Sequence, residues 1–305
     1  MEHDHRTNHM PATVTTDDQQ GRTPQKEVSL VFDRMNQSSE SNLRLALGAL
    51  LGTVPHFDLA CIGSSINGFA SFTFQMISYL ACADIVYYYP PSAQHLQLVK
   101  LLNSNVVDMH DGLYSRGNAF EISYDAIVKT VMQAVRSGKK VVYATQGSPA
   151  FHCGTAAALY RRAKKEGFSS VLVSGVSSFE LLSTELIEEY DIRDVQILSV
   201  LSLVENSIRI NSRVSALLFD LSRHVLPSIR QPATALSPSK LTTFADILRS
   251  TYPRTHEVVL MHMKCNGKCS KSKTRLVDLE DSIMNFGAVP TIFVPAYRET
   301  QSQFR

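Results

Sequence analysis

The chain has 305 residues, 44% of them hydrophobic and 19% charged, which is enough for two modest globular domains. Its formal net charge of +2 provides no basic surface for nucleic-acid phosphates, so a nucleic-acid partner is not expected. No apolar run approaches the roughly 20 residues of a membrane span, and the N-terminus lacks the apolar core of a signal peptide. Five cysteines at scattered spacing form no disulfide framework, which makes a reducing cytoplasm the expected location.

Four regions are predicted along the chain. Residues 1–27 are polar and without periodicity, which predicts a disordered tail. Leucines recur along one side of the following segment, so residues 28–55 are predicted to be an N-terminal helical extension that packs on the sheet or on a second subunit. An N-terminal α/β domain is predicted over residues 56–178, and a C-terminal α/β domain over residues 179–305.

Strands alternate with amphipathic helices in the predicted first domain, which is typical of a parallel α/β sheet. The expected strands are 58–63, 85–89, 106–109, 141–145 and 171–173. The expected helices are 73–82, 95–103, 124–136 and a segment that ends at 166. Two loops of small residues, 146–150 and 174–178, directly follow two of the strands. Open α/β sheets bind ligands at the carboxyl ends of their strands, so these loops are the predicted ligand site. The tyrosines 87–89 end a strand and could line a pocket, but alternation between core and surface is the favoured expectation.

The predicted second domain has longer strands and fewer crossover helices, which indicates a mixed or antiparallel sheet. The expected strands are 195–204, 214–219, 256–262 and 291–295, and the expected helices are 179–190, 243–250 and 276–285. Segment 229–239 is expected to be a loop. His262, Cys265 and Cys269 have a spacing seen among metal ligands, but a single Cys-x-x-x-Cys among lysines favours a solvated loop over 264–273 with no metal.

A tight Gly-Pro loop, a helix, a Gly-Val-Ser-Ser loop and a closing TIFVP strand follow one another in this chain. This order resembles the tetrapyrrole methylase superfamily of S-adenosylmethionine (SAM) methyltransferases over residues 57–297. The resemblance implies a two-domain class III fold, with a parallel-sheet N-terminal domain and a mixed-sheet C-terminal domain. It also implies a homodimer that holds SAM between the domains without a metal. The cofactor-binding residues that it implies are Gly63, Gly147, Ser148, Ala150, Phe151, Ser177, Ser178 and Thr291.

The chain is also similar to the borosin α-N-methyltransferases, which methylate backbone amides of a peptide. Their signature has tyrosines and an arginine ahead of a helix, followed by a YGHPG-like loop. Ungapped spacing places Tyr114 and Tyr124 on two of the signature tyrosines. Arg116 is the expected substitute for the signature arginine, and Gln146 occupies the position of the loop tyrosine. The resemblance therefore implies an acceptor site formed by Tyr114, Arg116, Tyr124 and Gln146.

Four positions depart from the family pattern: Ser65, Phe120, Gln146 and Ser148. Three functions therefore stay open for a SAM-binding chain. The first is N-methylation of a peptide backbone amide, with the peptide expected in trans because the sequence ends at Arg305. The second is methylation of a small-molecule natural product, and the third is SAM binding without turnover.

The chemistry defines what the site must supply. Methyl transfer from a sulfonium is an in-line displacement that depends on positioning and desolvation of the acceptor. An amide nitrogen must lose its proton while negative charge builds on the carbonyl oxygen. A tyrosine hydroxyl can take or donate that proton, and an arginine can stabilise the oxyanion. Gln146 can orient the acceptor but cannot act as an acid or base near neutral pH.

Overall fold

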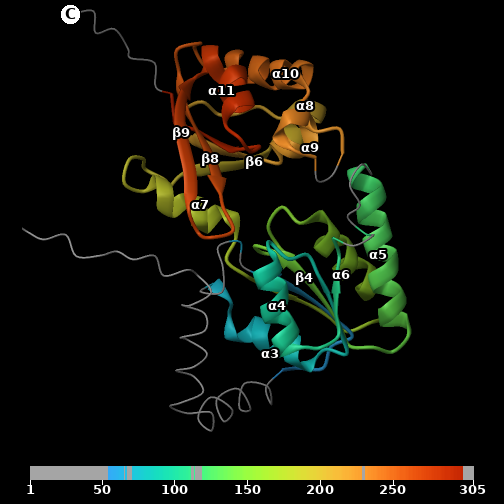
Figure 1. The fold of residues 1–305 in the computed structure, drawn as a ribbon. Coiled ribbons are helices and arrows are strands. Elements are labelled where there is room, and N and C mark those ends of the chain that lie inside the picture. The colour runs from blue at the N-terminus through green and yellow to red at the C-terminus, as the bar shows by residue number, and fades with distance from the viewer. Residues whose placement is uncertain are drawn as a thin grey trace, which may run out of the picture. The chain divides into compact units, whose positions relative to one another are not determined.

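The computed structural model describes residues 54–64, 66, 71–110, 113, 119–228 and 231–297 (Figure 1). The predicted tail and all but the last two residues of the predicted helical extension lie outside the described residues. The described residues all belong to one compact unit, Leu50–Arg305. None of the helices in this part of the chain is long and apolar enough to cross a membrane.

The first sheet is entirely parallel, as predicted, with strands in the order β3-β2-β4-β1-β5. Its strands are β1 (Leu59–Ser64), β2 (Ile85–Tyr88), β3 (Val106–Asp108), β4 (Val141–Gln146) and β5 (Ser170–Val173). The connecting helices are α3 (Phe74–Cys82), α4 (Ala93–Leu102), α5 (Phe120–Arg136) and α6 (Gly154–Lys165). The central strands β1, β2 and β4 are almost completely buried, as expected for a parallel sheet covered on both faces.

Helices cover the two faces of this sheet in pairs. Leu59 and Val141 point to the face packed by α5 and α6, whereas their neighbours Ala60 and Val142 point to the face packed by α3 and α4. Figure 1 shows these helices around the sheet. Strands β1 and β4 lie side by side, but the helices that follow them cover opposite faces. Such a reversal opens a crevice beyond the carboxyl ends of the two strands, where open α/β sheets bind their ligands.

The second sheet is mixed, as predicted, with strands in the order β6-β7-β10-β8-β9. Its strands are β6 (Val195–Ser199), β7 (Ser215–Phe219), β8 (Glu257–Met263), β9 (Cys269–Arg275) and β10 (Thr291–Val294). Only β6 and β7 pair in parallel among the described strands of this sheet. One face packs on α8 (Val200–Glu205), α9 (Leu221–Val225), α10 (Pro238–Arg249) and α11 (Leu279–Asn285). The other face packs on α7 (Ser178–Leu186) and on Phe151.

Two segments of the second sheet differ from the prediction. The apolar run 195–204 is not one strand, because it ends as β6 at Ser199 and continues as α8, whose buried residues Val200 and Leu203 lie one helical turn apart. The lysine-rich run 264–273 is not only a loop, because β9 begins at Cys269. Among the described strands, β9 pairs only with β8, and the exposed edge of a sheet readily accepts lysine and serine side chains.

Helix starts account for two further differences. Helix α5 begins at Phe120 rather than at Tyr124. The sequence gives no signal for this start, because the N-cap residue Ala119 has no side chain that could accept a hydrogen bond. Helix α10 begins at Pro238, inside the predicted loop 229–239, because proline fits the first turn of a helix. The boundary predicted at residue 178 stays a prediction.

An exposed ion pair joins the ends of α5 and α6. Nε and Nη2 of Arg136 donate to the two carboxylate oxygens of Glu166 at 2.8 and 2.7 Å, and Arg162 also donates to this carboxylate. These hydrogen bonds from Arg136 and Arg162 lower the pKa of Glu166 from 4.5 to about 2. Because the folded-state pKa lies below the unfolded one, the stabilisation is complete above pH 4.5 and is lost as the pH falls towards 2.

We therefore expect Glu166→Gln to lower the thermal unfolding midpoint slightly at neutral pH. The difference from wild type should shrink as the pH falls below 4.5. Circular dichroism melts at neutral and acidic pH measure both effects. Glu188→Gln, at an exposed position, is the matched control and should show no such pH dependence. A deficit in Glu166→Gln that persists unchanged in acid would contradict the assigned ion pair.

Candidate functional site

The carboxyl end of β1 meets the loops that follow β4 and β5. The residues at this meeting point are Gly63, Gly147 and Gly175. A Cβ added at Gly63 would lie 2.6 Å from the backbone nitrogen of Gly175 and would strike the carbonyl oxygen of Gly147. Gly147 has a φ of +70°, which glycine adopts without strain. The Ser64 Oγ donates to the carbonyl oxygen of Thr145 at 2.9 Å and ties β1 to β4. The loops therefore approach one another backbone to backbone.

The loop after β5 is fixed by the start of α7. Ser177 is the N-cap of this helix, and its Oγ accepts a hydrogen bond from the backbone N–H of Phe179 at 3.2 Å. The Glu180 carboxylate accepts in turn from the backbone N–H of Ser177 at 2.9 Å. This reciprocal capping holds the loop in one conformation beside Gly147.

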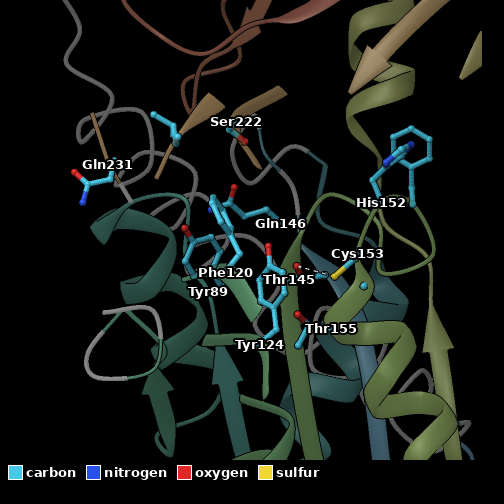
Figure 2. A pocket seen from close by; sticks show the side chains of 13 residues that line it. Tyr89, Phe120, Tyr124, Thr145, Gln146, His152, Cys153, Thr155, Ser222 and Gln231 are labelled. Carbon is cyan, nitrogen blue, oxygen red and sulfur yellow. Dashed lines mark hydrogen bonds between the residues drawn. The ribbon is translucent and has the colours of Figure 1, made fainter. Parts of the chain in front are cut away.

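A pocket of about 390 Å³ lies at the carboxyl end of β4 (Figure 2). This volume is within the range typical of small-molecule sites. Its wall includes the aromatic rings of Tyr89, Phe120, Tyr124 and Phe151. The side chain of Gln146 also lines it. None of the described residues that line the pocket is an aspartate, glutamate, lysine or arginine. The pocket therefore suits an uncharged group that offers both apolar surface and hydrogen-bonding atoms.

Tyr124 is held on the pocket wall by its neighbours on two helices. Its ring centre lies 6.3 Å from that of Phe120, and the guanidinium carbon of Arg223, in α9, lies 5.6 Å from its ring centre. Burial raises the pKa of Tyr124 above its usual 10.0, and the charge of Arg223 offsets this only in part. The hydroxyl therefore stays protonated at neutral pH.

A histidine–aspartate pair connects the loop after β4 with the segment before α9. Nδ1 of His152 lies 2.9 Å from a carboxylate oxygen of Asp220, and the His152 ring stacks on Phe219 with ring centres 5.1 Å apart. Burial favours a higher pKa for Asp220, but the hydrogen bond and charge of His152 outweigh it and lower that pKa. Both residues have positive φ, 47° and 64°, which is uncommon outside glycine. Figure 2 shows His152 apart from Tyr124 and Gln146.

The structure brings some of the predicted acceptor-site residues together. Tyr124 and Gln146 both line the pocket (Figure 2). Tyr114 and Arg116 lie outside the described residues. Phe120, which occupies the position of the signature arginine, also lines the pocket. The catalytic roles of these residues stay predictions.

The predicted cofactor residues lie in the three loops and at one strand of the second sheet. Phe151 lines the pocket, while Gly147, Ser148 and Ala150 precede it in the same loop. Gly63 lies near the carboxyl end of β1, Ser177 is the N-cap of α7, and Ser178 is the first residue of that helix. Thr291 begins β10 and is not among the residues that line the pocket.

Sequence reasoning missed several residues at or beside the pocket. Tyr87 and Tyr88 do not alternate between core and surface, because both are buried in a strand covered on two sides, and Tyr89 lines the pocket. His152 and Arg223 were not predicted at all. Their only sequence signals are a histidine within the small-residue loop and an arginine shortly after the apolar strand β7. No cluster of three or more potential metal ligands occurs within the described ranges.

Comparisons with known proteins agree with this geometry. The model of the Tetrapyrrole (Corrin/Porphyrin) Methylases matches residues 58–263. A type I borosin cyclic peptide precursor methyltransferase of Coprinopsis marcescibilis is 30% identical over 129 residues, which cover 42% of this chain and 32% of that protein. The lentinulin A precursor methyltransferase of Lentinula edodes is 28% identical over 130 residues, which cover 42% of this chain and 30% of that protein. The match thus spans less than one third of each relative's length.

Solved structures share the fold at low sequence identity. Cobalt precorrin-4 methyltransferase superposes with a TM-score of 0.53 and 17% identity over 80% of this chain and 98% of its own. Uroporphyrin-III C-methyltransferase from Thermus thermophilus superposes with a TM-score of 0.55 and 14% identity over 78% of this chain and 94% of its own. At such identities the likeness shows the fold alone. The family model, however, matches most of the described residues, and the chain belongs to the tetrapyrrole methylases, a family of SAM-using methyltransferases.

Proposed function

We propose that the protein is a SAM-dependent methyltransferase that N-methylates a backbone amide of a peptide. The observation that carries this proposal is the uncharged pocket wall on which the neutral phenol of Tyr124 lies near the amide of Gln146 (Figure 2). A peptide amide is itself uncharged and offers one carbonyl acceptor and one N–H donor. The partial similarity to borosin methyltransferases supports the same acceptor class.

The residues at the crevice fit SAM. The backbone of Gly147 carries no side chain, and an added Cβ there would lie 3.5 Å from Ile66 Cδ1 and 3.8 Å from the Ser177 Cα. The φ of +70° accounts for glycine at this position, and without a side chain its backbone can be approached closely by a ligand. The ring of Phe151 and the nearby carboxylate of Asp220 suit a sulfonium cation. When bound, SAM supplies an electrophilic methyl group.

The chain's own residues then act on the acceptor. Tyr124 donates a hydrogen bond to the carbonyl oxygen, on which negative charge develops as the amide nitrogen loses its proton. Gln146 orients the amide through its own N–H and carbonyl groups. The apolar rings of Phe120 and Phe151 line the pocket and limit the number of water molecules beside the reacting atoms. The family resemblance further supports a homodimer, and the five scattered cysteines support a cytoplasmic location.

Calorimetry with SAM and with S-adenosylhomocysteine tests cofactor binding. We expect both to bind to the folded protein, because both share the adenosine and amino-acid parts that would contact the three loops. Folding should be verified by circular dichroism on the same sample. A folded protein that gives no heat with either compound would overturn the methyltransferase proposal.

The departures at Phe120, Gln146 and Ser148 keep two other functions as alternatives, a small-molecule acceptor and SAM binding without turnover. A library of octapeptides made of Gly, Ala, Val, Leu and Phe separates them. Each peptide is acetylated and ends in a dimethylamide, so its backbone amides are its only N–H groups. The same library with free N-termini adds an amine acceptor. Release of S-adenosylhomocysteine with the blocked library favours amides, release only with free amines favours another acceptor, and binding without release favours an inactive homologue.

A further inference from the structure

One arginine reaches the pocket wall from the helices of the second sheet. Arg223 belongs to α9, and its guanidinium carbon lies 5.6 Å from the centre of the Tyr124 ring. Its Nη2 lies 3.7 Å from a carboxylate oxygen of Glu121, which is too far for a normal hydrogen bond. Its helical neighbours Ser222 and Leu226 line the pocket. Arg223 therefore lies beside the tyrosine to which the proposed function assigns the acceptor's carbonyl oxygen.

Arg223 also has hydrogen-bonding capacity that its surroundings do not use. Its Nε is buried and has no hydrogen-bond partner in the part of the chain that the structure describes. Folded proteins satisfy nearly all buried N–H groups, so an unsatisfied one beside the ring of a pocket residue calls for an explanation. A guanidinium presents only donors, in a fixed planar fork. The group that would satisfy it must therefore be an oxygen acceptor, such as the carbonyl of a peptide.

The position of Arg223 is fixed from the opposite wall. Asp220 lies three residues before it and is bonded to His152 in the loop after β4. The left-handed backbone of both bonded residues leaves this link few alternative geometries. The link therefore holds the start of α9 against the loop that follows Gln146 at the end of β4. It limits the movement of Arg223 away from Tyr124.

We propose that Arg223 is a catalytic residue of this methyl transfer, donating from Nε to the carbonyl oxygen of the acceptor amide beside the Tyr124 hydroxyl. This inference rests on the proposed function, because it requires an acceptor with a carbonyl oxygen. The N–C bond forms as the C–S bond of the sulfonium breaks, sulfur keeps that electron pair, and the amide proton passes to water. The cation of Arg223 stabilises the negative charge that builds on the carbonyl oxygen.

The first arm of the test measures turnover of a blocked peptide that the wild type methylates. Arg223→Gln should lower kcat/KM by about 10²- to 10³-fold, as loss of an oxyanion donor does elsewhere. Arg223→Lys keeps the charge but lacks the planar guanidinium donors, so its kcat/KM should fall less than that of Arg223→Gln. SAM affinity, measured by calorimetry, should be unchanged in both. Arg193→Gln, which breaks an exposed ion pair with Asp191, is the control and should match wild type.

The second arm requires no acceptor and follows the titration of Tyr124 by ¹³Cζ NMR, with Tyr124→Phe identifying its resonance. The charged and titratable groups around this phenol are Arg223, Asp220, Cys153, Tyr89 and Glu121. The charge of Arg223 lowers the pKa of Tyr124 against the raising effect of burial. Arg223→Gln should therefore move the titration to higher pH, whereas Arg193→Gln should not.

The outcomes separate this inference from the function on which it rests. A wild-type protein that binds SAM but methylates no blocked peptide contradicts the proposed function. A wild type that methylates the blocked peptide while Arg223→Gln does so equally well contradicts only the role of Arg223. An unchanged Tyr124 titration in Arg223→Gln would show that the cation does not lie over this ring, and it would overturn the inference in either case.

Discussion

Gly63→Ala is expected to destabilise the protein by about 3 kcal/mol, at the upper end of the usual cost of overpacking. The new methyl group would lie 2.6 Å from the Gly175 nitrogen and would also strike the Gly147 carbonyl oxygen. Both are backbone atoms of strand-end loops, which cannot rotate away as a flexible side chain does. Relief of the clash therefore requires β1 to separate from β4 or β5, whose register with β1 is fixed by parallel pairing.

Urea unfolding of wild type, Gly63→Ala and Gly154→Ala measures this effect. Gly154 is the matched control, because a Cβ there meets nothing within 4 Å and the position lies in helix α6. Alanine is a better helix former than glycine, so Gly154→Ala should be as stable as wild type or slightly more stable. Equal stability of Gly63→Ala and wild type would show that the three loops do not pack as described.

Tyr124→Phe is expected to reduce methyl transfer by about 10²-fold while leaving SAM affinity nearly unchanged. The substitution removes one hydroxyl and keeps the ring, so the contacts with Phe120 and Arg223 remain. What is lost is the donor that would stabilise charge on the acceptor's carbonyl oxygen. The predicted result is a lower kcat at saturating SAM, with an unchanged calorimetric binding constant for SAM.

Tyr160→Phe provides the control for this variant. Tyr160 also lies in a helix with a cation near its ring, since Lys164 Nζ is 5.9 Å from the ring centre, but it does not line the pocket. It should retain full activity. If Tyr124→Phe is as active as Tyr160→Phe, the Tyr124 hydroxyl is structural and the acceptor is oriented by other groups.

The first sheet was predictable because its strands are short apolar runs separated by amphipathic helices and glycine turns. Buried strands such as β4 require apolar residues on both faces, and this requirement is visible in the sequence. Strand β9 was not predictable for the opposite reason. As an edge strand it needs little apolar surface, and Lys271 and Lys273 are tolerated there because the edge faces solvent.

The candidate site was predictable only where local sequence defines it. The loops at Gly147 and Ser177 follow directly from small residues at strand ends, and Tyr124 follows from the resemblance to the borosin signature. Arg223 reaches the ring of Tyr124 from a short helix of the other sheet, about a hundred residues further along the chain. Its approach depends on tertiary packing, for which a single sequence without homologues carries no signal.

The central claim is that this chain transfers the methyl group of SAM to a backbone amide. Tandem mass spectrometry of the blocked peptide library, incubated with the protein and SAM carrying a deuterated methyl group, tests it most directly. We predict peptides in which one labelled methyl replaces the hydrogen of a backbone amide, with the fragment ions assigning it to nitrogen. Protein that binds SAM and leaves every blocked peptide unlabelled, while labelling peptides with free amino groups, would contradict the claim.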